Sequence, residues 1–83
     1  MDYVFHSDSG HGWLQVGMDE IRMLKLRNVI SNYSYKLGNK VYLEEDCDAS
    51  LFINAMENMG YKLTYKHVDY EGDCFIRNLN PYE

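Results

Sequence analysis

Two short hydrophobic runs lie near the start of the chain, at residues 3–6 and 13–16. Both contain the aromatic and β-branched residues that are typical of strands. The stretch between the two runs is rich in Ser, Asp and Gly, which favour turns, so we expect a hairpin here. Met18, Ile21 and Leu24 then recur at helical spacing and predict a short first helix.

A second hairpin is the most clearly marked element of the chain. Residues 29–37 and 41–44 are both β-prone, and Gly38 and Asn39 lie between them. Gly and Asn readily adopt the left-handed backbone that a two-residue hairpin turn requires. The sequence therefore predicts two antiparallel strands joined by a tight turn.

The tyrosines of this hairpin are expected to share one face. Tyr35 lies opposite Tyr42 in the predicted register, and Tyr33 lies on the same side. Val41 and Leu43 lie on the other face. Tyrosine is common at interfaces, because its ring is apolar and its hydroxyl tolerates water. Two alternatives stay open: the tyrosines face a partner, or they face the core and the Val41 side looks outward.

The strongest helix is expected after Asp48, where four apolar residues recur at i, i+3, i+4 and i+7. These residues are Phe52, Ala55, Met56 and Met59. Asp46 or Asp48 can cap the start of the helix, and Gly60 suits the left-handed residue that often follows a helix. The apolar stripe predicts that the helix packs on the sheet.

Two further strands are expected at residues 61–66 and 74–77, followed by a frayed tail. The element order is then β-β-α-β-β-α-β-β. This order predicts an α+β fold, with a small antiparallel sheet and two helices. A length of 83 residues fits a single domain over residues 1–83.

Charge and cysteine content narrow the classes of function. The chain has 13 acidic and 8 basic residues, for a net charge of −5. A negative field disfavours direct binding to nucleic acid or an anionic membrane and suits a protein partner with a basic surface. The first residues do not resemble a secretory signal, and no apolar run is long enough for a membrane span. We expect a cytoplasmic protein in which Cys47 and Cys74 are reduced.

A metal site is one hypothesis. His6, Asp8 and His11 lie within six residues of one another, and imidazole and carboxylate groups bind divalent metals. Their spacing matches no established zinc pattern. The alternative is that Asp8 makes hydrogen bonds within the turn and that the histidines are partly exposed. The second hypothesis for function is therefore a small metal-binding domain or metal-dependent enzyme. The leading hypothesis, a protein that acts by binding another protein, requires no cofactor.

An acidic run surrounds Cys47, with Glu44, Glu45 and Asp46 before it and Asp48 after it. The negative charges disfavour the thiolate, so Cys47 is expected to be a buried structural cysteine and not a nucleophile. Helix capping uses only one of the four acids. The others are expected to form a solvated or partner-facing edge.

The leading hypothesis combines this acidic edge with the tyrosine face, because the acidic run begins at the end of the strand that carries Tyr42. Charged rims and aromatic anchors are typical of protein interfaces. The predicted binding residues are Glu44, Glu45, Asp46, Asp48, Tyr33, Tyr35 and Tyr42. No phosphate-binding glycine loop or Ser/His/Asp arrangement is present, so we expect a noncatalytic protein.

Three segments carry a family resemblance. They read FHSDSGHGWL at residues 5–14, ISNYSY at residues 30–35 and VYLEEDCDA at residues 41–49. These segments resemble a family of small proteins encoded by phages, prophages and plasmids, over roughly residues 4–53. The resemblance implies an accessory protein of a mobile element in a bacterial cell, one that binds and modulates a host or viral protein. Inhibition of a defence nuclease or CRISPR system is one such role. The resemblance does not assign a function to any individual residue of this chain.

Overall fold

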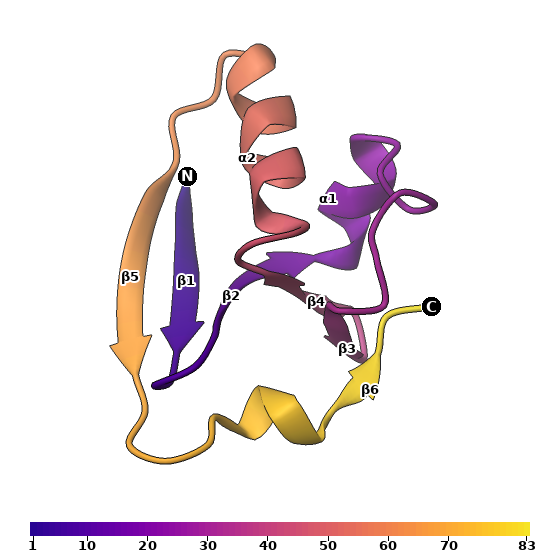
Figure 1. The fold of residues 1–83 in the computed structure, drawn as a ribbon. Coiled ribbons are helices and arrows are strands. Elements are labelled where there is room, and N and C mark those ends of the chain that lie inside the picture. The colour runs from indigo at the N-terminus through magenta and orange to yellow at the C-terminus, as the bar shows by residue number, and fades with distance from the viewer.

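The computed structural model describes residues 1–83 and has an α+β fold built on one six-stranded sheet (Figure 1), which confirms the predicted fold class. The strands are β1 (Asp2–Ser7), β2 (Gly12–Gly17), β3 (Tyr35–Leu37), β4 (Lys40–Glu44), β5 (Thr64–Asp69) and β6 (Asn80–Pro81). The helices are α1 (Met18–Met23), α2 (Ala49–Asn58) and a short 3-10 helix, η1 (Phe75–Asn78). None of the helices has the length and apolar character needed to cross a membrane.

The strands lie in the order β5-β1-β2-β4-β3-β6, and every neighbouring pair is antiparallel except β1 and β5. In the parallel pair, Tyr3 lies opposite Tyr65. The wholly antiparallel sheet expected from the sequence is therefore wrong at this edge. The reason is that the chain returns through α2 before β5 begins, so that β5 runs beside β1 in the same direction (Figure 1).

Both faces of the central strands are buried, so Tyr42 faces a core and the Val41 side does not look outward. On one face, side chains of the central strands pack against α1 and α2. This first core includes Leu14, Val16, Val41 and Leu43 from the sheet with Ile21, Phe52 and Met56 from the helices. The C-terminal segment that contains η1 covers the other face, where the second core consists of Trp13, Tyr42, Cys74 and Ile76. Tyr35 does pair with Tyr42, as the turn predicted.

The hairpin itself is shorter than predicted. Residues 29–33 form no strand, and β3 begins only at Tyr35. The side chain of Asp48 accepts hydrogen bonds from the Ser31 N–H at 3.1 Å and from the Ser34 hydroxyl at 2.5 Å. These bonds hold the segment before β3 in turns against the start of α2.

The helix α2 lies where the sequence predicted it, with Phe52 and Met56 fully buried. Its stripe is narrower than expected, because Met59 is exposed. Gly60 has a φ of 89°, the left-handed conformation predicted for it. Asp48 occupies the cap position, but its side chain makes no capping bond because the two serines already engage it.

The C-terminal segment differs most from the prediction. The strand expected at residues 74–77 is instead the 3-10 helix η1, followed by the short strand β6 on the edge of the sheet. The expected frayed tail is also wrong, because Tyr82 is buried. Its N–H donates to the Ser34 carbonyl at 2.8 Å, and its hydroxyl donates to the Arg27 carbonyl at 2.6 Å.

Candidate interaction site

One pocket contains four of the seven binding residues predicted from the sequence. It has a volume of about 350 Å³. Tyr33, Tyr35, Glu44 and Asp46 line it, from β3, β4 and the loops beside them. Its other lining residues are His11, Trp13, Asn32, Cys47 and Arg77. We refer to it as the aromatic-acidic pocket.

Trp13 forms the buried base of this pocket. It lies on β2 opposite Glu44 of β4 and is only 2% exposed. Tyr35 meets the indole edge-on with ring centres 6.3 Å apart, and the Arg77 guanidinium lies 5.4 Å from the indole centre. The indole N–H has no hydrogen-bond partner in the protein, although an unpaired buried donor costs about 1–3 kcal/mol. The base is thus a packed aromatic surface with one unsatisfied donor.

The rim of the pocket combines a fixed carboxylate with freely accessible groups. Glu44 is almost buried, and its Oε2 accepts the Asp46 N–H at 3.0 Å. Its Oε1 lies 4.0 Å from Nδ1 of His11. In contrast, the side chain of Asp46 is exposed, and Tyr33 is 67% exposed. Asp46 and Tyr33 are therefore the groups that an incoming ligand meets first.

Cys47 is exposed at this rim, so the expectation that it is buried is wrong. The neighbouring Glu44 carboxylate raises the pKa of the thiol, and the negative charges of Asp48 and Asp46 raise it further. The thiol therefore stays protonated at neutral pH, which argues against a role as nucleophile. Cys74 is buried, and both cysteines are free thiols.

Asp8 and Arg77 form an ion pair that holds the C-terminal segment against the sheet. Asp8 accepts from Nε of Arg77 at 2.5 Å and from Nη2 at 2.7 Å, and its side chain is only 1% exposed. It also accepts the backbone N–H groups of Gly10, His11 and Cys74. The Arg77 guanidinium and these N–H groups hold the pKa of Asp8 far below its usual range. Arg77 is thereby fixed over Trp13, with its charge neutralised.

We expect the ion pair to stabilise the fold fully above about pH 4 and progressively less as the pH falls below that value. A depressed folded-state pKa stabilises the protein above the pKa of the unfolded carboxyl, about 3.9, and this stabilisation is lost as pH falls toward the folded-state pKa. Asp8→Asn should therefore lower the melting temperature strongly at pH 7, and the difference from wild type should shrink on acidification. Glu71→Gln, at an exposed position without an ion pair, is the matched control. A difference that is constant from pH 7 to about pH 2 would contradict this role.

Three predicted binding residues do not belong to the pocket. Tyr42 is buried in the second core, and Asp48 is buried against Ser31 and Ser34. Glu45 is exposed but does not line the pocket. Tyr42 and Asp48 therefore serve the packing of the fold and cannot meet a partner directly.

The three residues of the metal hypothesis have separate hydrogen-bonding roles. Nδ1 of His6 lies 2.9 Å from the Tyr70 hydroxyl, and its Nε2 lies 2.8 Å from Oε1 of Gln15. Asp8 is occupied by Arg77, and His11 lies in the aromatic-acidic pocket. No group of three or more His, Cys, Asp or Glu side chains is arranged to hold a metal ion.

Sequence reasoning missed three pocket residues, Trp13, Asn32 and Arg77. Trp13 is the only Trp of the chain and lies directly after the turn that contains His11. Its large aromatic side chain could have been recognised as a buried anchor. Arg77 gave no such signal, because its position depends on the fold of the C-terminal segment over the sheet.

These features define a small α+β protein with an aromatic and acidic pocket on the sheet face opposite α1 and α2. Comparison of the chain with family models, curated proteins and solved structures found no match.

Proposed function

We propose that the protein is a noncatalytic interaction protein of a phage or other mobile element, which acts in the cytoplasm of the bacterial host. It binds a host or viral protein through the aromatic-acidic pocket. The observation that carries this proposal is that Tyr33, Tyr35, Glu44 and Asp46 line one pocket. The resemblance of residues 4–53 to proteins of mobile elements supports the biological setting.

The chemistry of the pocket suits a basic side chain of the partner. Aromatic rings attract a Lys or Arg head group through their π faces, and carboxylates pair with it. Tyr33 and Tyr35 supply the rings, and Glu44 and Asp46 supply the carboxylates. The cation already present, Arg77, is neutralised by Asp8 and leaves the negative charge of the rim unopposed.

A basic partner surface is common where a protein binds nucleic acid. In one version of the proposal, the protein inhibits a defence nuclease or a CRISPR effector by covering such a surface. Its net charge of −5 supports attraction to that surface over the long range, and the tyrosines supply the short-range contacts.

Capture from host lysate by the immobilised protein tests this proposal. Tyr33→Ala should weaken capture of the partner at all salt concentrations, by roughly tenfold or more, because an aromatic side chain that a partner buries can contribute about 2 kcal/mol. Asp46→Lys should weaken capture mainly at low salt, where the rim charge is least screened. Both side chains are exposed, so neither variant should unfold the protein.

Two surface variants outside the pocket serve as controls. Tyr61→Ala removes another exposed tyrosine, and Glu71→Lys makes the same charge change as Asp46→Lys. A true partner is captured by the wild type and both controls but is lost with the pocket variants. If the same proteins bind all five forms equally, the pocket is not the interaction site.

A further inference from the structure

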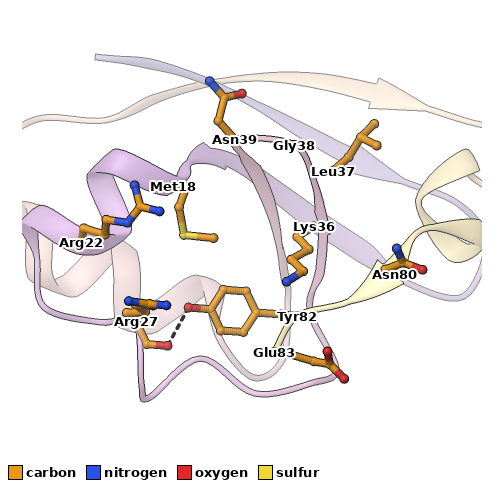
Figure 2. Close-up of a pocket in the computed structure, with 10 residues that line it drawn as sticks. All are labelled: Met18, Arg22, Arg27, Lys36, Leu37, Gly38, Asn39, Asn80, Tyr82 and Glu83. Carbon is orange, nitrogen blue, oxygen red and sulfur yellow. Dashed lines mark hydrogen bonds between the residues drawn. The ribbon is translucent and has the colours of Figure 1, made fainter.

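A second pocket, of about 420 Å³, lies between the end of α1, the loop after it, β3 and the C-terminal segment (Figure 2). Three cationic side chains line it: Arg22, Arg27 and Lys36. Glu83 is the only acidic residue in its lining. We refer to it as the basic pocket.

The basic pocket is separate from the aromatic-acidic pocket. Lys36 and Tyr35 are successive residues of β3, so their side chains point to opposite faces of the sheet. Lys36 borders the basic pocket, and Tyr35 borders the aromatic-acidic one. No residue lines both pockets.

The fold brings the three cations together around Tyr82. In Figure 2, Arg22 and Arg27 lie on one side of the pocket with Met18, and Lys36 lies on the other side with Tyr82. The Tyr82 hydroxyl donates to the Arg27 carbonyl, which fixes the loop that carries Arg27. Burial raises the pKa of Tyr82, and the positive charges of Arg27 and Arg22 partly oppose this rise.

The positive charge of this pocket is largely unpaired. Arg27 and Lys36 form no ion pair with any carboxylate, and Arg22 forms only an exposed pair with Asp19 at 3.3 Å. The chain has eight basic residues and a net charge of −5, yet three of the eight line one pocket. Like charges repel, and an anion bound between the three side chains would relieve this repulsion.

We propose that the basic pocket binds the phosphate group of a small phosphorylated ligand. Two guanidinium groups can each donate two parallel hydrogen bonds to phosphate oxygens, and Lys36 adds a point charge from the opposite side. The volume is within the range of small-molecule sites, so it has room for an organic group beside the phosphate. The partly exposed Met18 side chain supplies an apolar contact for that group.

Titration of the ¹⁵N-labelled protein followed by NMR tests this proposal at constant ionic strength. The probes are inorganic phosphate, pyrophosphate and ADP, with chloride as the anion control. We expect saturable shifts of the amide signals around Arg27, Lys36 and Tyr82, with a Kd of about 1 mM or lower for at least one probe. Binding of phosphate as tightly as ADP would mean that the oxyanion alone is recognised. Tighter binding of ADP would mean that the organic group is also bound.

Matched charge reversals identify the site. Lys36→Glu should weaken binding by about tenfold or more, whereas Lys62→Glu changes the net charge equally, at an exposed position outside the pocket, and should have little effect. Where Lys36→Glu fails to fold, Lys36→Met keeps the stem of the side chain and removes only the charge. Shifts that do not saturate, or an equal loss of binding in the Lys62 variant, would overturn the proposal, because the anion would then be responding to overall charge.

Discussion

Replacing Phe52 by Ala is expected to lower the free energy of unfolding by about 4 kcal/mol. Phe52 is fully buried between α2 and the sheet and meets the Tyr3 ring edge-on, with ring centres 5.4 Å apart. The substitution removes a large apolar group and leaves a cavity that the surrounding sheet cannot fill. A domain of this size has a total stability of roughly 4–12 kcal/mol, so the substitution should remove about a third of it or more.

Urea unfolding followed by the fluorescence of Trp13, the only tryptophan, measures this effect. Leu51→Ala is the matched control, because Leu51 precedes Phe52 on α2 but is exposed. The control should cost less than about 1 kcal/mol. Equal losses in the two variants would mean that α2 is held by its helix propensity and not by packing on the sheet.

Replacing Asp48 by Ala is expected to cost about 3 kcal/mol or more, because it leaves several buried donors without a partner. The carboxylate of Asp48 is 3% exposed. It accepts hydrogen bonds from the N–H and hydroxyl of Ser31 and from the hydroxyl of Ser34. Ser34 in turn accepts the Glu44 N–H, so the loss would spread to β4 beneath the aromatic-acidic pocket.

Two further substitutions distinguish this role from helix capping. Asp48→Ser keeps a good capping residue, and a capping role therefore predicts almost full stability for this variant. We expect instead a loss close to that of Asp48→Ala, since a serine hydroxyl is too short to replace the carboxylate between the two serines. Asp46→Ala, at an exposed position, should change stability by less than about 0.5 kcal/mol. Unfolding in urea would establish which role is correct.

The turn of the second hairpin and the helix α2 could be predicted from the sequence, because both depend on neighbouring residues. Gly38 at the turn and the period of two in the flanking residues predicted the pairing of Tyr35 with Tyr42, because a two-residue turn sets the register of the strands it joins. The spacing of Phe52 and Met56 located α2, because helical periodicity is visible within a few turns. The proximity of the acidic run to Tyr33 and Tyr35 could also be predicted, because the run begins at Glu44, the last residue of β4.

Contacts between segments that are distant in the sequence could be seen only in the folded protein. Residues 74–79 cover the second face of the sheet and bury Tyr42, although period-two alternation gives no information on which faces will be covered. Asp8 binds Arg77, 69 residues later in the chain, and holds it over Trp13. The side chain of Asp48 accepts hydrogen bonds from the loop before β3 and does not cap α2. The basic pocket likewise exists only because the C-terminal segment places Tyr82 beside Arg27. Such contacts are selected by the packing of the whole chain, and no local pattern encodes them.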